Sequence, residues 1–368
     1  MLTPLLPASD LALFQNHYHN ARQQFLAEVN RVPHLLCCEA HQLPVNAPDN
    51  ESLFTDCAWI GSDGARNVLV LISATHGVEG YAGSAIQADF LRQLSSQHWQ
   101  LPDDTAVLVV HALNAWGMAW LRRCDQQGID LNRNFLDFSK PLPGNPGYQQ
   151  LRDWLLLDDA AARRQRLAQY AAEYGQSALE VAISGGQYED PLGPFYGGSE
   201  PAFAHQLVKN LMNQYALGER RLAVIDLHTG LGPYGYGEVI CDHTPDSDGA
   251  RTAHSWYGDS VTLPLAGTSS SVPKLGLLDF AWHEIMQAHS CFVTLEFGTY
   301  SIDSLFKTIL ADHRLHMRGA IDWLDPRTSE IKHRILHHFY PSDDGWREMV
   351  LLRARQVIRL ALQGLRNK

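Results

Sequence analysis

Five short segments with few polar interruptions recur along the chain and predict buried strands. They are residues 67–73, 105–113, 221–228, 237–243 and 291–298, which are rich in aliphatic and β-branched side chains. A strand that is covered on both faces is apolar almost throughout, whereas a half-exposed strand alternates between apolar and polar residues. The five segments therefore predict the centre of a sheet with helices on both faces.

Segments with helical spacing lie between these predicted strands. The pattern predicts an amphipathic helix from Ser9 to about Val32 and a closing helix from about Ser342 to Gly364. Further helices are expected over 81–96, 149–183, 200–217 and 301–317. Alternating strands and helices are typical of the α/β class. We expect a mixed, mostly parallel central sheet.

The domain organisation is predicted to be simple. The 368 residues contain no internal repeat, low-complexity tract or long linker rich in proline, glycine or serine. We therefore expect one domain over residues 1–368, with a helical insertion at about 140–218 and a C-terminal helical extension at about 320–368.

Composition restricts the function classes. The net charge is −11, which disfavours a nucleic-acid partner because such proteins carry clustered positive charge. The first residues lack a basic segment followed by an apolar core, and no stretch approaches ~20 apolar residues, so we expect neither a secretory signal nor a membrane partner. Six scattered cysteines suggest reduced thiols and a cytoplasmic protein.

Polar residues with ligand chemistry stand where the apolar segments end. His76 and Glu79 follow the first segment, and His228 ends the third. Ligands bind at the carboxyl ends of strands in open α/β sheets, so these side chains are expected to converge. Two histidines and one glutamate form a catalytic zinc set that leaves a position for water. The alternative is a solvated turn with incidental polar residues.

Glu296 lies inside the last apolar segment, between Leu295 and Phe297. A buried glutamate is rare without a partner, so this position needs an explanation. It could be a general base beside a metal or one half of a buried structural ion pair.

Arginines and asparagines form a third polar group, in "RRCDQQGIDLNRNF". Arg133 offers a planar set of donors that suits a carboxylate, and Asn132 can add a hydrogen bond. Arg122 or Arg123 could stabilise an oxyanion. The structural alternatives are a capped turn with a salt bridge and a solvated arginine pair.

Taken in order, four motifs resemble those of the zinc carboxypeptidase clan, which includes the succinylglutamate desuccinylase/aspartoacylase enzymes. They are "HGVE" at 76–79, the block at 111–135, "DLHTG" at 226–230 and "TLEFGT" at 294–299. The order and approximate separations agree with the clan, and the sequence resembles a bacterial branch of it. The resemblance implies the clan's phosphorylase/hydrolase-like fold.

The resemblance also implies a role for each matched residue. His76, Glu79 and His228 would bind one zinc ion per chain, and Glu296 would be the general base. Arg123 lies nine residues before Asn132, the spacing of the clan's carbonyl-polarising arginine. Asn132 and Arg133 would hold a substrate carboxylate, and Asp130 would hydrogen-bond the first histidine.

The sequence departs from the clan's pattern at two places. Ala115 stands where a proline usually follows the asparagine. The stretch 269–284 lacks the tyrosine that classical carboxypeptidases carry roughly twenty residues before the glutamate. Four tyrosines elsewhere are candidates to replace it, namely Tyr234, Tyr236, Tyr257 and Tyr300.

The predicted activity is zinc-dependent hydrolysis of an amide bond next to a free carboxylate. The substrate is either the C-terminal end of a small peptide or an N-acyl amino acid, and residues 185–198 form either a pocket wall or an ordinary loop. Ser271 and Lys274 offer a different chemistry, a serine nucleophile with a lysine base. A relative that binds carboxylates without cleaving them is the non-enzymatic alternative. The sequence leaves the oligomeric state open.

Overall fold

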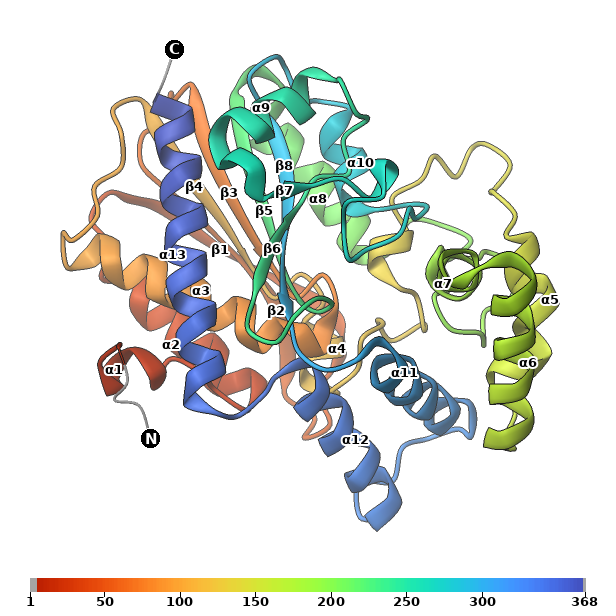
Figure 1. Ribbon diagram of the computed structural model, residues 1–368. Coiled ribbons are helices and arrows are strands. Elements are labelled where there is room, and N and C mark those ends of the chain that lie inside the picture. Colours follow the sequence, from red (N-terminus) through yellow and green to blue (C-terminus); the bar gives the residue numbers. More distant parts are fainter. Residues whose placement is uncertain (1–4, 367–368) are drawn as a thin grey trace.

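The structure is a computed structural model that describes residues 5–366, and a mixed sheet of eight strands forms its centre (Figure 1). The strands lie in the order β1-β2-β4-β3-β5-β8-β6-β7. Their bounds are Leu35–Asn46 (β1), Ser52–Ile60 (β2), Asn67–Ser73 (β3), Thr105–His111 (β4), Arg221–Gly230 (β5), Gly237–Ile240 (β6), Val261–Thr262 (β7) and Cys291–Gly298 (β8).

The central strands run parallel, as the sequence predicts. β4, β3, β5 and β8 are neighbours in parallel pairs, and the short β6 and β7 also pair in parallel. β1, β2 and β4 form antiparallel pairs at one edge, and β6 lies antiparallel to β8. The prediction of a mixed, mostly parallel sheet is confirmed.

Two hydrophobic cores cover the two faces of the sheet. Leu69 and Leu71 of β3 point into the first core, and Val68 and Val70 point into the second. The helices over the first face are α2 (Tyr18–Val29), α3 (Gly80–Ser95), α9 (Asp248–Tyr257) and α13 (Asp344–Arg366), and those over the second are α8 (Phe203–Gln214) and α10 (Leu278–His283). The alternation of a strand's side chains thus builds both cores.

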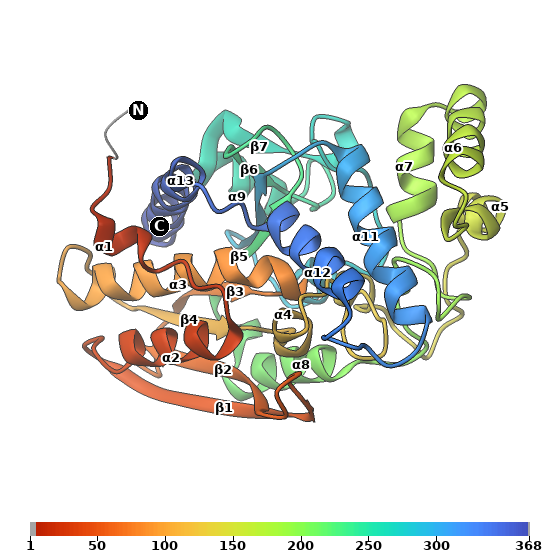
Figure 2. The same cartoon turned by 90° about the horizontal axis from the view of Figure 1, so that it is seen from below.

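A third core lies beyond the sheet, where α5 (Pro146–Leu155), α6 (Ala160–Tyr174) and α7 (Gln176–Ser184) stand beside α11 (Ile302–Met317) and α12 (Pro326–Phe339) (Figures 1 and 2). Leu151 and Leu179 of the predicted insertion share this core with Ile309, Ile335 and Phe339. The insertion and the start of the C-terminal extension therefore contribute to one core, in which α11 lies between α7 and α12 (Figure 2).

Two predicted helices are interrupted. The N-terminal one is α1 (Ala8–Leu11) followed by α2, because Leu13 and Phe14 turn into the core and Phe14 stacks on Tyr340. The helix predicted over 149–183 is three helices. The side chain of Asp159 caps α6, and Gly175 has a φ of 92°, which ends α6 and begins α7.

The sheet is wider than predicted, because the sequence analysis did not identify β1 and β2. β1 alternates between more and less exposed residues, as expected of an edge strand, and has no continuous apolar run. A short helix, α4 (Ala115–Ala119), follows β4. The closing helix α13 is not peripheral, since Trp346 and Val350 belong to the first core.

Two further observations concern the chain's environment. None of the helices in the described part of the chain is long and apolar enough to cross a membrane. The six cysteines are all free thiols.

Candidate metal centre

The candidate ligands come together at the carboxyl ends of three neighbouring strands. His76 follows β3, His228 lies in β5, and Glu296 lies in β8 directly opposite His228 in the parallel register. Glu79 ends a single 3₁₀ turn, Gly77–Glu79, that leads into α3. Because β3, β5 and β8 are adjacent, residues separated by more than 200 positions meet at this edge.

The glycines of the "HGVEG" segment are explained by close packing. A Cβ on Gly77 would lie 2.2 Å from the backbone of Gly117, and one on Gly80 would lie 2.4 Å from the Cβ of Ala74. Gly80 itself has an ordinary helical φ of −59°. The glycines therefore let the turn approach α4 and β3 closely, and they do not supply an unusual backbone conformation.

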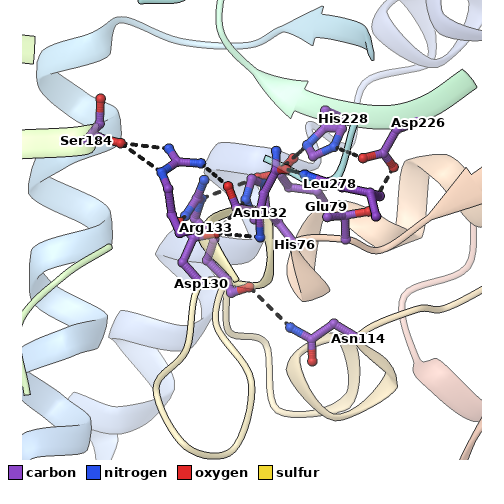
Figure 3. A network of polar contacts seen from close by, with 12 residues as sticks. His76, Glu79, Asn114, Asp130, Asn132, Arg133, Ser184, Asp226, His228 and Leu278 are labelled. Atoms are coloured by element: carbon purple, nitrogen blue, oxygen red, sulfur yellow. Dashed lines mark hydrogen bonds and ion pairs between the residues drawn. The ribbon is translucent and has the colours of Figure 1, made fainter. Parts of the chain in front are cut away.

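The three predicted ligands present their polar atoms to one point (Figure 3). His76 Nδ1 lies 3.0 Å from Glu79 Oε1, and His228 Nδ1 lies 3.2 Å from Glu79 Oε2. The two Nδ1 atoms are 3.2 Å apart. All three side chains are buried. A solvated turn with incidental polar residues would not have this arrangement.

The opposite ring nitrogen of each histidine faces an aspartate. His76 Nε2 is 3.0 Å from Asp130 Oδ1, and His228 Nε2 is 2.6 Å from Asp226 Oδ2. Asp226 also accepts a hydrogen bond from Thr75. A carboxylate in this position favours a proton on Nε2 and turns the Nδ1 lone pair toward the common point. Asp130 is where the sequence predicts it, whereas Asp226 was not identified.

The charges of this cluster favour a cation at its centre. Burial lowers the pKa of His228, but Asp226 and Glu79 outweigh it and raise that pKa well above its ordinary value. A proton or a metal ion can supply the positive charge that these two carboxylates favour. Two ligand atoms ~2.0–2.1 Å from zinc at a tetrahedral angle are about 3.3 Å apart, close to the observed separations. The residues thus fit a zinc ion.

Arg123 lies against the same cluster. Its Nη1 donates to Asp130 Oδ2, its Nε is 3.7 Å from Glu79 Oε1, and its guanidinium packs on the ring of Phe195. Although burial opposes ionisation of Asp130, Arg123 and Arg133 hold its pKa well below the usual range. Arg122 instead lies beside Asp312, away from the candidate ligands.

Glu296 borders the cluster as a buried carboxyl without a cationic partner. Its Oε1 accepts a hydrogen bond from the backbone N–H of Leu231 at 2.9 Å, and no ion pair is found for it among the described residues. Burial and the nearby charge of Glu79 raise its pKa to about 8. The structural ion-pair interpretation therefore does not apply.

Arg133 and Asn132, the predicted carboxylate-binding pair, already form hydrogen bonds with backbone groups (Figure 3). Arg133 Nε and Nη2 both donate to the carbonyl oxygen of Ser184, at 3.0 and 2.7 Å. Asn132 Oδ1 accepts from the N–H of Leu278 at 2.8 Å, which leaves its amide nitrogen for a ligand. Both residues line the same pocket as His76 and Glu296.

The pocket contains charged residues that the sequence analysis did not assign to this site. Lys274 lines it, as do Asp242 and Asp279. Burial raises the pKa of both aspartates, and the charge of Asp242 further raises that of Asp279. Asp242 lies at the end of the predicted strand 237–243, two residues beyond the observed β6, so the strand-end rule could have found it. Lys274 reaches the pocket from a loop and Asp279 from the first turn of α10, and no local sequence pattern shows either placement.

The alternative serine chemistry receives limited support from the geometry. Lys274 Nζ does contact Ser271 Oγ. Burial and the charge of Arg133 lower the pKa of Lys274 to about 8, so at neutral pH it is mostly an ammonium that donates to the hydroxyl and does not deprotonate it. None of the four candidate tyrosines lines the pocket, and of residues 185–198 only Phe195 does.

Comparison with known families assigns the sequence to one family. A family model described as "Protein of unknown function (DUF2817)" matches residues 14–353. The chain belongs to this family. A search of curated proteins found no match.

Solved structures with related folds agree with the predicted resemblance. Carboxypeptidase A from Helicoverpa armigera matches at a TM-score of 0.51 and 11% identity, over 95% of this chain and 73% of that one. Succinylglutamate desuccinylase from Chromobacterium violaceum matches at a TM-score of 0.37 and 14% identity, over 89% and 75%. The match to carboxypeptidase A shows that this DUF2817 chain has a carboxypeptidase-like fold, as the resemblance predicts.

Proposed function

We propose that this protein is a zinc-dependent hydrolase that cleaves an amide bond next to a free carboxylate. The observation that carries the proposal is the convergence of His76, Glu79 and His228 on one point beside Glu296. Zinc at that point would supply a Lewis acid for the scissile carbonyl and for water. A single ion per chain would account for the three ligands.

The chain's own residues supply the remaining chemistry. Glu296 would accept the proton of the attacking water and return it to the leaving amine, which its position in the pocket and the absence of an ion-pair partner support. Arg123 would hold the developing oxyanion, since its Nη2 donates no hydrogen bond to the described residues. Arg133 and Asn132 would orient the substrate by its carboxylate.

The substrate is proposed to be a small peptide or an N-acyl amino acid. The peptide corresponds to the metallocarboxypeptidase-like activity, and the N-acyl amino acid corresponds to an amidohydrolase of the desuccinylase/aspartoacylase kind. A carboxylate-binding relative without activity is the remaining alternative.

The substitution Glu296→Gln tests whether the protein hydrolyses its ligand or only binds it. The amide cannot accept the proton, so we expect the variant to keep its zinc and to lose activity by about 10²–10⁴-fold. The assay screens N-acyl amino acids and N-blocked dipeptides for amine release by zinc-loaded wild type and variant. Unchanged activity in Glu296→Gln would refute its role, and a wild type that cleaves nothing while retaining zinc would favour the non-catalytic relative.

A further inference from the structure

Two cations in the pocket lack an acidic partner. Arg133 is buried and Lys274 is partly buried, and neither has a carboxylate oxygen within 4.0 Å among the described residues. Taking a positive charge out of water is costly unless an anion compensates it. Two such cations that line one pocket therefore indicate that the pocket takes an anionic group.

Arg133 cannot offer all of its N–H donors to an anionic ligand. Of its five N–H groups, one on Nε and one on Nη2 are used by Ser184 O, and one on Nη1 is used by the carbonyl of its neighbour Asn132. Two N–H groups remain for a ligand. A carboxylate has about four acceptor sites, so a second donor beside Arg133 would improve its binding.

Lys274 is placed to be that second donor. Its ammonium donates to Ser271 Oγ and, at 2.9 Å, to the carbonyl of Val272, which leaves one of its three N–H groups without a protein acceptor. The charges that act on it most strongly are those of Arg133, Asp242 and Glu296, all of which line the same pocket. The ammonium thus shares the pocket with the predicted carboxylate-binding arginine and the predicted base, and it is close enough to feel the charge of both.

The loop that carries Lys274 is fixed at both ends. At its start, the buried carboxylate of Glu238 accepts hydrogen bonds from Ser269 Oγ at 2.8 Å and from the N–H of Ser270 at 3.1 Å. At its end, Gly276 O accepts from Phe135 N at 3.0 Å, and a Cβ on Gly276 would lie 2.1 Å from the carbonyl oxygen of Arg133. The position of Lys274 is therefore tied to the segment that carries Arg133.

We propose that Lys274 binds the carboxylate of the substrate together with Arg133, and so helps to select substrates that carry a free carboxylate. This inference rests on the proposed function for the identity of the anion. Lys274 lies within residues 269–284, the stretch that contains no tyrosine. Its role is in positioning, because the charge holds the non-reacting end of the substrate and leaves proton transfer to Glu296.

Equilibrium dialysis tests this role without relying on hydrolysis. The probes are an equimolar mixture of N-acetyl amino acids and the same mixture as carboxamides, and mass spectrometry measures which members zinc-loaded protein retains. All proteins carry Glu296→Gln so that no probe is cleaved. Lys274→Met is compared with Lys209→Met, which removes an exposed lysine that pairs with Glu284. Lys274→Gln and Lys274→Arg are measured in parallel, in case Lys274→Met does not fold.

We expect the protein to retain acids in preference to carboxamides. Loss of a charge-assisted hydrogen bond should weaken retention of the acids about 10- to 100-fold in Lys274→Met and Lys274→Gln, with partial recovery in Lys274→Arg and no change in Lys209→Met. In the active protein the same change should raise KM more than it lowers kcat.

The outcomes distinguish this inference from the proposed function. Equal retention of acids by Lys274→Met and its parent would overturn the inference, as would failure of the parent to retain any acid. Retention of acids that depends on Lys274, together with a wild type that hydrolyses no amide, would support the inference and contradict the proposed hydrolase.

Discussion

Asp226 and Asp130 each hold one histidine of the candidate metal centre in place. Each aspartate contacts the ring nitrogen that faces away from the centre. Replacing Asp226 by Asn removes the charge that orients His228, and loss of such a partner typically lowers metal affinity about 10–100-fold. We expect this loss in Asp226→Asn, measured by competition for zinc with a chelator of known affinity.

The control for this measurement is Asp49→Asn. Asp49 belongs to another group that could hold a metal, with His19 and Glu51, and it is largely exposed. Its substitution should leave the tight zinc affinity unchanged. An Asp226→Asn protein with the affinity of the wild type would show that His228 does not depend on its aspartate.

Among single residues, sequence reasoning found those that lie at strand ends or in recognisable motifs. His76, Glu79, His228 and Glu296 were found because strand ends converge in α/β sheets, and the structure brings them together. Asp226 could have been found, since residues two apart in a strand share a face. Lys274 could not be placed from sequence, because its loop is held by contacts with residues distant in the chain, at Glu238, Gly185 and Phe135.

Among the elements, accuracy depended on how deeply each one is buried. The continuously apolar central strands were predicted within a few residues, whereas β1 was missed because its alternation resembles an irregular surface segment. The predicted helix at 149–183 is three helices, although Asp159 is an ordinary signal for the start of a helix and Gly175 an ordinary signal for its end. Those signals were present in the sequence and were outweighed by the long helical pattern.

The loop around Gly276 provides a test at the scale of an element. Gly276 has a φ of 64° and no room for a Cβ, whereas Gly267 has a φ of 69° and nothing within 4 Å. Both alanine substitutions should cost about 1–2 kcal/mol for the left-handed backbone. Gly276→Ala should cost about 1–3 kcal/mol more, because the loop must move away from Arg133. Urea unfolding of the two variants measures this difference.

The comparison of these two glycines isolates the packing contribution. Equal destabilisation of Gly276→Ala and Gly267→Ala would show that the loop is not held tightly against Arg133. It would also weaken the argument that fixes Lys274 beside that arginine.

For the whole molecule, buried neutral histidines are expected to make the fold sensitive to acid. Burial lowers the pKa of seven of them, to about 3 for His111, 4 for His243, 3 for His283, 4 for His313, 2 for His316 and 4 for His338, and also below the usual value for His205. In the unfolded chain a histidine titrates near ~6.5. Below that pH the unfolded state binds more protons, so stability is complete above ~6.5 and falls as the pH decreases.

His111 allows this effect to be measured at one position. It is fully buried, stacks on Phe25 and is hydrogen-bonded to Ser84. It should account for about 2 kcal/mol of the stability lost between pH 7.5 and pH 5. His111→Phe should reduce that loss by the same amount, measured by urea unfolding at both values. The readout is the change with pH, because loss of the hydrogen bond lowers stability equally at both.

The control for His111 is the exposed His98, whose replacement by Gln should leave the change with pH as in the wild type. The metal centre also titrates in acid, but it is common to all three proteins and cancels in the comparison. A His111→Phe protein that loses as much stability on acidification as the wild type would show that His111 is not held neutral.

The central claim is that His76, Glu79 and His228 hold a catalytic zinc ion, and elemental analysis of the purified protein tests it most directly. Wild type is compared with His76→Ala and with His19→Ala, which removes the histidine of the more exposed group at Asp49 and Glu51. We predict one tightly bound zinc per chain in the wild type and in His19→Ala, and none in His76→Ala. No zinc in the wild type after reconstitution at neutral pH, or zinc that persists in His76→Ala, would contradict the account.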